Sequence, residues 1–279
     1  MGTLYLVATP LGNLEDITLR ALRILREASL IATEDTRTTG QLLKHFDLHR
    51  PLVSYFEYNK VTRLERILAA LVEGDVALVS EAGTPLLSDP GYELVRAAIE
   101  RGFPVVSIPG PSALGAALPA SGLPTDRFLF LGFLPRKAGD RRRLLQEVAV
   151  EKATLVFFEA PHRLRETLAD MVDYLGADRP IALCRELTKL YEEIWRGTLA
   201  EASREWQQRE PRGEFTLVVG GAPAPATWNQ AQVEAELARA ISAGVSVKDA
   251  VRQVAVQSGR GKREVYALAQ QVKEAQAEE

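Results

Sequence analysis

Three loops of this chain have the composition of ligand-binding turns, because glycine, proline and hydroxyl residues are concentrated in them. They read ATPLGN from residue 8, SEAGTPLLSDPG from residue 80 and PGPSALG from residue 109. Each follows a short apolar run and precedes an amphipathic stretch, so each is predicted to join a strand to a helix. Backbone N–H groups in such turns, together with the dipole of the following helix, can bind an anionic group. We expect one ligand site where the three loops meet, although tight turns without a ligand have a similar composition.

Carboxylates lie at the same edge of the predicted first sheet as these turns and could accept a proton from a substrate. Glu34 and Asp35 follow a predicted strand, and Glu81 follows another, directly before the Gly83 turn. Asp35 also precedes a predicted helix start at Thr36 and could simply cap that helix. Asp89, in the sequence DPG, is interpreted as a turn or cap residue. The pattern makes Asp35, Glu34 and Glu81 the candidate catalytic residues and does not choose among them.

Established nucleotide and metal motifs are missing from the sequence. It contains no GxxxxGK[ST], and none of the three loops reads GxGxxG. His45 and His49 have the spacing of a zinc-binding helix, but Phe46 stands where that pattern needs glutamate. The single cysteine, Cys184, and three histidines leave too few ligands for a structural zinc site. The sequence therefore predicts no metal.

Strand and helix patterns alternate along most of the chain, which is typical of an α/β fold. Predicted strands cover residues 4–8, 30–33, 51–54, 76–80 and 105–108, and then 128–132, 154–158, 181–185, 193–196 and 216–219. The first five favour a mostly parallel sheet with helices on both faces. Residues 112–124 are small and apolar and are interpreted as a connection. We expect two consecutive α/β domains, residues 1–115 and 116–224, and a small all-helical extension, residues 225–279.

Composition excludes several classes of protein. The 279 residues include 46% hydrophobic and 25% charged residues, as in an ordinary globular chain. The net charge of −3 argues against a surface that binds nucleic acid over its whole extent, although local basic patches remain possible. No apolar run approaches the roughly 20 residues of a membrane helix. One cysteine cannot form an intramolecular disulfide. We expect a cytoplasmic protein that does not contact membranes.

Seven collinear stretches of the sequence are characteristic of one family. They read LYLVATPLGNLEDITLRAL, ATEDTRTTGQLLKHF, LVSEAGTPLLSDPGYELVR, IPGPSALGAALPASGLPTDRFLFLGFLP, TLVFFEAPHRL, RELTK and GEFTLVV. The chain resembles the tetrapyrrole methylase superfamily and, within it, the branch that methylates ribosomal RNA. Porphyrin-type relatives have Gly-Asp-Pro where this chain has Gly83-Thr84-Pro85, as in the RNA branch. The chain departs from that branch at Phe56-Glu57-Tyr58-Asn59, where two histidines are common.

This resemblance implies a fold, a cofactor and a substrate. Members of the superfamily bind S-adenosylmethionine in a cleft between two α/β domains and are usually homodimers. The RNA branch methylates the ribose 2′-oxygen of a decoding-centre cytidine, cytidine 1402, of 16S rRNA in the small ribosomal subunit. The departure at residues 56–59 puts in doubt any mechanism that needs the two histidines.

The chemistry of S-adenosylmethionine selects residues in the loops and in the second domain. Its carboxylate needs backbone donors, its sulfonium tolerates a partly apolar wall with carbonyl oxygens, and its adenine needs an apolar slot. The expected contacts in the first domain are Pro10, Leu11, Gly83, Thr84, Pro85, Leu87, Ser112 and Ala113. Those in the second domain are Phe158, Glu159, Cys184 and Arg185.

Basic residues near the loops and in the extension are candidates for contact with RNA phosphates. Residues 248–263 carry a net charge of +4 around a turn at Gly259 and Gly261, and the flanking apolar stripes predict two short helices. A packing or dimer contact would explain these helices equally well. The candidate RNA-binding residues are Arg37, Lys60, Arg136, Lys137, Arg141, Arg142, Arg260, Lys262 and Arg263.

Two other functions stay open at this point. A porphyrinoid C-methyltransferase would have the same fold and no use for a basic cluster at residues 136–143. A non-catalytic assembly factor that binds ribosomal RNA would retain the cleft without methyl transfer. Binding of S-adenosylmethionine distinguishes an enzyme from such a factor.

Overall fold

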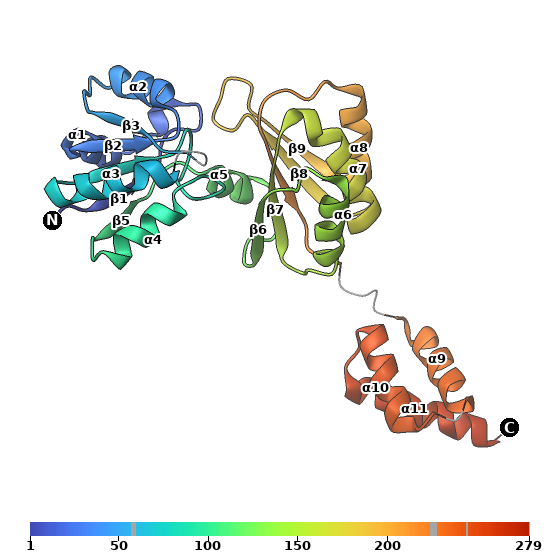
Figure 1. The fold of residues 1–279 in the computed structure, drawn as a ribbon. Helices are drawn as coiled ribbons and strands as arrows, with labels where there is room; N and C mark the ends of the chain where they lie inside the picture. The colour runs from blue at the N-terminus through green and yellow to red at the C-terminus, as the bar shows by residue number, and fades with distance from the viewer. Residues whose placement is uncertain (57–59, 224–227, 244, 279) are drawn as a thin grey trace. The chain divides into compact units, whose positions relative to one another are not determined.

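The computed structural model of the chain describes residues 1–56, 60–223, 228–243 and 245–278 (Figure 1). The chain divides into two compact units, residues 1–221 and residues 222–279. Both predicted α/β domains lie in the first unit, and the second unit is helical. The fold class expected from the sequence, two successive α/β domains followed by an all-helical extension, is confirmed.

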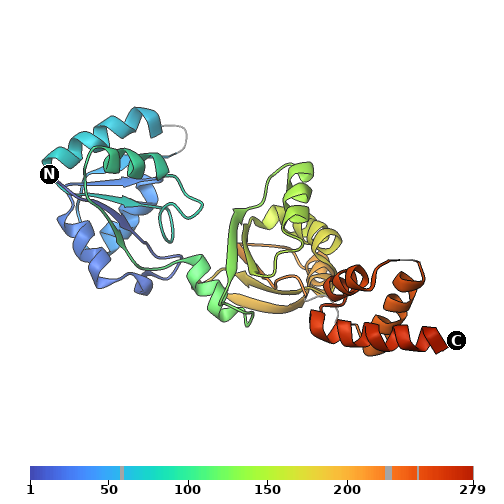
Figure 2. The same cartoon turned by 90° about the horizontal axis from the view of Figure 1, so that it is seen from below.

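The first domain is built on a parallel sheet. Its strands, in the order β3-β2-β4-β1-β5, are β1 (Leu4–Val7), β2 (Leu30–Thr33), β3 (Leu52–Ser54), β4 (Val76–Val79) and β5 (Val105–Ile108). A single turn, η1 (Leu14–Asp16), precedes α1 (Leu19–Glu27). α1 and α2 (Thr36–His45) cover one face of the sheet, and α3 (Lys60–Glu73) and α4 (Tyr92–Glu100) cover the other (Figure 2). Because the strands are parallel, the loops that follow them meet at one edge of the sheet.

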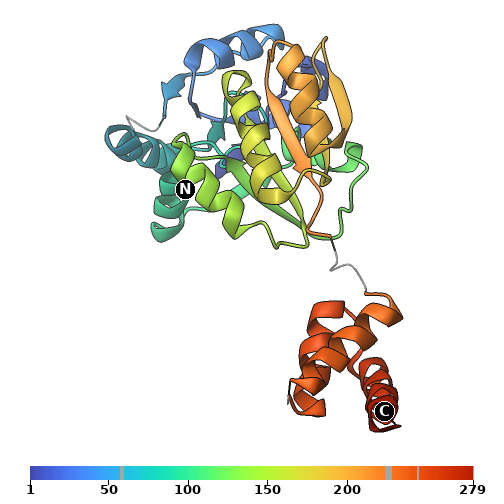
Figure 3. The same ribbon diagram turned by 90° about the vertical axis from the view of Figure 1, so that its right-hand side faces the viewer.

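The second domain has a mixed sheet in the order β6-β7-β10-β8-β9. Its strands are β6 (Phe128–Phe133), β7 (Thr154–Glu159), β8 (Pro180–Arg185), β9 (Glu193–Thr198) and β10 (Phe215–Val219). β6 and β7 are parallel, and the other neighbouring pairs are antiparallel. The helices α6 (Ala138–Glu147), α7 (Leu164–Leu175, after the turn η2, Pro161–Arg163) and α8 (Leu199–Gln208) pack on one face (Figure 3).

A helix lies within residues 112–124, which from the sequence alone were expected to form only a connection. It is α5 (Ala113–Ala120), and it packs on the face of the second sheet opposite α6–α8. The Ser112 hydroxyl caps it by accepting from the Gly115 N–H, and Pro119 lies in its last turn. The segment is apolar on all sides, so it lacks the polar and apolar periodicity that reveals a surface helix.

The C-terminal unit contains three helices, α9 (Gln230–Ser242), α10 (Val247–Ser258) and α11 (Lys262–Glu278), within the described residues. Val233, Leu237, Val254, Val265 and Ala269 belong to their common core. Gly259 is the C-cap of α10, and its φ of +67° favours glycine. The apolar stripes and the glycine turn predicted for residues 247–272 are thus present, and α9 packs on them as a third helix.

Candidate cofactor and active site

Two adjoining cavities lie where the loops after β1, β4 and β5 meet the second domain. The acidic cavity, of about 740 Å³, is lined by Thr9, Pro10, Leu11, Gly12, Leu14, Glu34, Thr38, Thr39, Gln41, Leu42, His45, Ser80, Glu81, Ala82, Ser88, Asp89, Phe133, Lys189 and Glu214. The apolar cavity, of about 300 Å³, is lined by Leu11, Ala82, Gly83, Thr84, Leu87, Ser88, Asp89, Ser112, Ala113, Phe133, Phe158, Glu159, Ala160, Pro161, Glu214, Phe215 and Thr216. All three loops identified in the sequence contribute to this pair of cavities.

Hydrogen bonds hold the three loops together. Thr9 and Gly83 exchange N–H···O bonds of 2.9 Å in both directions, and the Thr84 hydroxyl donates to the Pro111 carbonyl at 3.0 Å. Gly83 has a φ of +82°, and a Cβ atom added there would lie 3.1 Å from Leu11 Cδ2. Leu86 and Ser88 also have positive φ, a conformation that is costly for these residue types. The backbone in this region is therefore fixed closely against the cavity wall.

Aromatic and small residues of the second domain form the far wall of the apolar cavity. Phe158, at the end of β7, packs edge-to-face against Phe133 with 5.7 Å between ring centroids. Phe215 and Thr216 of β10 lie beside it in the wall. Such a wall suits a flat heterocycle, because apolar rings bury its faces and nearby main-chain groups can bind its edges.

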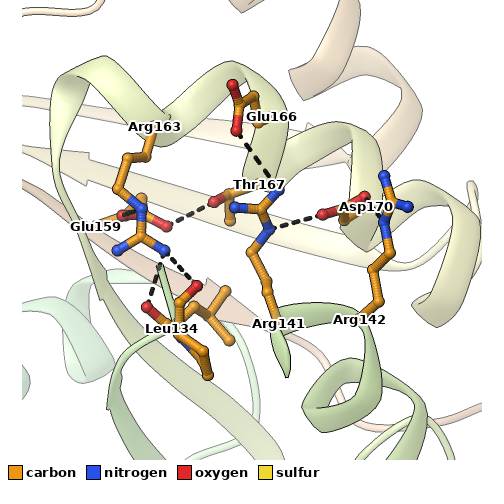
Figure 4. A network of polar contacts seen from close by, with 9 residues as sticks. Leu134, Arg141, Arg142, Glu159, Arg163, Glu166, Thr167 and Asp170 are labelled. Carbon is orange, nitrogen blue, oxygen red and sulfur yellow. Dashed lines mark hydrogen bonds and ion pairs between the residues drawn. The ribbon is translucent and has the colours of Figure 1, made fainter. Parts of the chain in front are cut away.

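Glu159 lines the apolar cavity, but its carboxylate is occupied by internal partners (Figure 4). One oxygen accepts from the Ala160 N–H at 2.9 Å, and the other accepts from the Thr167 hydroxyl at 2.6 Å. Arg163 Nε lies 3.5 Å from the same carboxylate, and the Glu159 side chain is fully buried. Glu159 therefore shapes the turn between β7 and α7, and we assign any cofactor contact there to the main chain.

Three residues expected to contact the cofactor lie outside both cavity linings. Cys184 is buried in the core between β10 and β9, where burial raises its thiol pKa to about 11. Arg185 donates from Nε to the Arg212 carbonyl at 2.7 Å, and Pro85 is buried. The neighbour of β7 in the sheet is β10 rather than β8, so Phe215 and Thr216 occupy the place that the sequence alone suggested for Cys184 and Arg185. We leave these three residues out of the proposed site.

The carboxylates of the acidic cavity influence one another. Burial, and then the charge of Glu34, raises the pKa of Asp89 to about 6, although a hydrogen bond from Ser80 opposes the shift. Burial, together with Glu81 and Asp35, also raises the pKa of Glu34. Asp89, interpreted from the sequence as a turn or cap residue, does not cap α4, because Gly91 is the N-cap of that helix. Asp89 lines both cavities, and its environment suits a proton acceptor that works near neutral pH.

Asp35 has a structural task. Its carboxylate caps α2 by accepting from the Arg37 N–H at 2.7 Å and the Thr38 N–H at 3.3 Å. The first of these hydrogen bonds contributes most to lowering its pKa. These hydrogen bonds confirm the capping interpretation. Asp35 is not part of either cavity lining, so we do not propose it as a base. Glu34 and Glu81 do line the acidic cavity.

A loop of the second domain, which contains the RELTK stretch, closes one side of the acidic cavity. The Lys189 ammonium donates to Glu186 and to Glu214, each at 2.9 Å. The Asn13 N–H donates to the Thr188 hydroxyl at 3.3 Å, which joins this loop to the loop after β1. Lys189 and Glu214 both line the cavity, and only the folded chain brings them to residues 9–12.

Among the basic residues chosen from the sequence, Arg141 is wrong as an RNA contact (Figure 4). Its side chain is 3% exposed and pairs with the buried Asp170 at 2.6 Å. Arg142 donates to the same carboxylate at 2.9 Å but remains half-exposed. Arg260 is bound to the Trp228 carbonyl and to Glu264. The side chain of Lys60 lies outside the described residues, whereas the remaining candidates are exposed, namely Arg37, Arg136, Lys137, Lys262 and Arg263.

Replacement of Arg141 tests this structural role. We expect Arg141→Ala to lower the free energy of unfolding by about 3–5 kcal/mol, because it leaves the carboxylate of Asp170 buried with only Arg142 beside it. Chemical denaturation measures the loss. Arg143→Ala on the same helix is the matched control. The Arg143 side chain is 73% exposed, and its ion pair with Asp140 is long, at 3.8 Å. Equal effects of the two substitutions would contradict the assignment.

Within the part of the chain that the structure describes, no group of three His, Cys, Asp or Glu residues could hold a metal ion. Among the same residues, no helix is long and apolar enough to cross a membrane.

Comparison with known proteins identifies the family. The family of Tetrapyrrole (Corrin/Porphyrin) Methylases matches residues 3–203. The chain belongs to this family. A ribosomal RNA small subunit methyltransferase I from Halalkalibacterium halodurans is 51% identical over 95% of the chain and 93% of its own length. A protein of the same name from Synechocystis is 46% identical over 96% of the chain and 97% of its own length.

A solved structure of the family supports the fold. The Thermus thermophilus uroporphyrin-III C-methyltransferase complexed with S-adenyl homocysteine superposes with a TM-score of 0.56 at 24% identity, covering 78% of this chain and 97% of that one. The family match and the names of the relatives show that the chain is a methyltransferase. The resemblance seen in the seven sequence stretches is confirmed.

Proposed function

We propose that the chain transfers a methyl group from S-adenosylmethionine to the ribose 2′-oxygen of cytidine 1402 in 16S rRNA. The observation that carries this proposal is the similarity along almost the whole chain to relatives named ribosomal RNA small subunit methyltransferase I. Gly83-Thr84-Pro85, in place of the Gly-Asp-Pro of porphyrin-type members, supports the same substrate class. A protein with this substrate works in the cytoplasm, and the resemblance implies that it works as a homodimer.

The apolar cavity fits S-adenosylmethionine. The first turn of α5 presents N–H groups that have no helical partner, and a carboxylate can accept from them. Gly83 leaves open the space that a side chain would fill, and Leu11 supplies the apolar wall beside it. Phe158, with Thr216 beside it on the same face of the sheet, can bury the adenine. The cofactor supplies an electrophilic methyl group on its sulfonium, so the protein's tasks are to position the ribose and to remove one proton.

We assign the removal of that proton to Asp89. It lines both cavities, so it lies where the cofactor site adjoins the site for the acceptor nucleotide. A carboxylate with a pKa near 6 is ionised at neutral pH and is more basic than an ordinary aspartate. Glu34 and Glu81 assist by raising that pKa through their negative charge.

The pH dependence of methyl transfer tests this assignment. A base must be deprotonated to act, so the rate should rise about tenfold per pH unit below the Asp89 pKa of about 6 and be level above it. Single-turnover rates at saturating cofactor, measured from pH 5 to pH 9, give the profile. A rate that does not change below pH 6 would contradict a role for Asp89.

The substrate class is tested by offering the protein two candidate substrates, small ribosomal subunits and a tetrapyrrole. We expect methyl groups from labelled S-adenosylmethionine to appear on small ribosomal subunits that lack the modification, and none to appear on uroporphyrinogen III. Transfer to the tetrapyrrole alone would indicate a porphyrinoid C-methyltransferase. Binding to the subunit without binding of the cofactor would indicate a non-catalytic assembly factor.

The exposed basic residues are the proposed phosphate contacts. In the first unit these are Arg37, Arg136 and Lys137, with the half-exposed Arg142, and in the helical unit they are Lys262 and Arg263. Neutralising phosphates releases counterions, so binding to the subunit should weaken steeply as salt is added.

A further inference from the structure

The helical unit contains a groove between α10 and α11, and its lining includes two of the proposed phosphate contacts, Lys262 and Arg263. It measures about 410 Å³ and is lined by Lys248, Asp249, Val251, Arg252, Lys262, Arg263 and Tyr266. We propose that this groove binds an unpaired nucleotide of the ribosomal RNA, with the base stacked on Tyr266 and the adjacent phosphates against Lys248, Lys262 and Arg263. This inference rests on the proposed function in assuming an RNA substrate.

The charge of the groove is strongly positive although the chain as a whole carries −3. Four cationic side chains line it against one carboxylate, that of Asp249. That carboxylate is engaged by the Ser246 hydroxyl at 2.7 Å and by Arg252 at 3.1 Å. Among the described residues, no carboxylate pairs with Lys248, Lys262 or Arg263. Their charges are therefore available to an anionic ligand.

Tyr266 supplies an aromatic surface in the midst of these charges. α11 buries Val265, Leu268 and Ala269 in the core of the unit, whereas Tyr266 lies on another face and is 51% exposed. Lys262 and Arg263 precede it by four and three residues, so all three side chains share one face of the helix. Packing within the unit does not require a large ring at this position.

Cations beside an exposed aromatic ring form the arrangement that binds single-stranded nucleic acid. The cations follow the phosphates, and the ring stacks on a base whatever its identity. In a duplex the bases are already stacked on each other, so a single ring in a groove favours unpaired RNA. An acidic peptide would satisfy the charges but would make no use of the tyrosine ring.

Binding of labelled oligoribonucleotides to the full-length protein tests the proposal by fluorescence anisotropy. We expect Tyr266→Ala to weaken binding of a single-stranded oligonucleotide by about 5- to 100-fold, which corresponds to one stacked base, while Tyr266→Phe retains the affinity. We expect Lys262→Ala to reduce the slope of log affinity against log salt by about 0.7, as for one phosphate on a single strand. Lys273→Ala, on α11 outside the groove, is the charge-matched control and should change neither quantity.

Several results would overturn the proposal. They are an unchanged affinity of Tyr266→Ala, a duplex bound as tightly as the single strand, or competition by polyglutamate as strong as by unlabelled single-stranded RNA. Methyl transfer to the small subunit is measured on the same preparations. If the parent protein methylates the subunit while Tyr266→Ala binds RNA normally, only the groove proposal fails. If the parent does not methylate RNA, the proposed function fails.

Discussion

Gly83→Arg should remove S-adenosylmethionine binding from a folded protein. Gly83 has a φ of +82°, and a Cβ atom there would lie only 3.1 Å from Leu11 Cδ2. A long side chain at this point would enter the apolar cavity of about 300 Å³ that we assign to the cofactor. We expect the dissociation constant to rise by about 100-fold or more, equivalent to about 2.7 kcal/mol, in isothermal titration calorimetry.

A second glycine separates this effect from backbone strain. Gly102 has a φ of +77°, follows α4 and is not part of either cavity lining. Gly102→Arg therefore carries a similar conformational cost without filling the cavity, and a Cβ atom there comes within 3.8 Å only of the Met1 side chain. We expect this variant to lose some thermal stability and to bind the cofactor as tightly as the parent. Cofactor binding by Gly83→Arg at parental affinity would show that the cavity is not the cofactor site.

Asp89→Asn should slow methyl transfer by about 10²–10⁴-fold, the usual contribution of a general base. The substitution keeps the size of the side chain and removes its ability to take a proton at neutral pH. The affinity for S-adenosylmethionine should change little, because we assign cofactor binding to backbone and apolar groups. Single-turnover kinetics on small subunits measure the rate, and calorimetry measures the affinity.

Asp35, which caps α2 and lies outside both cavity linings, provides the control for this experiment. Asparagine caps helices about as well as aspartate, so Asp35→Asn should preserve the start of α2 and leave the rate nearly unchanged. A large loss of rate in Asp35→Asn together with a normal rate in Asp89→Asn would reverse the two assignments.

Most of the strands could be predicted from the sequence. Each of the ten described strands begins and ends within two residues of its predicted bounds, because short β-branched runs bounded by glycine, proline or charged residues have few other interpretations. α5 could not be predicted in this way, since its residues are apolar on every side and therefore show no periodicity.

The site could be predicted where it depends on neighbours in sequence, and not where it depends on the order of strands. The loops at Leu11, Gly83 and Ser112 were found from composition alone. Phe215 was missed and Cys184 wrongly chosen, because only the sheet order shows that β10 lies between β7 and β8. The burial of Arg141 depends on Asp170, which lies 29 residues away and comes close only when α6 packs on α7.

The central claim is that this chain methylates the ribose of one nucleotide in the small ribosomal subunit. Small subunits lacking the modification would be incubated with the protein and S-adenosylmethionine, and the 16S rRNA then digested and mapped by mass spectrometry. We predict one added methyl group, on the ribose of cytidine 1402, and none after incubation with Gly83→Arg. A methyl group on a base or on a different nucleotide, or no methylation by a protein that binds the cofactor, would contradict it.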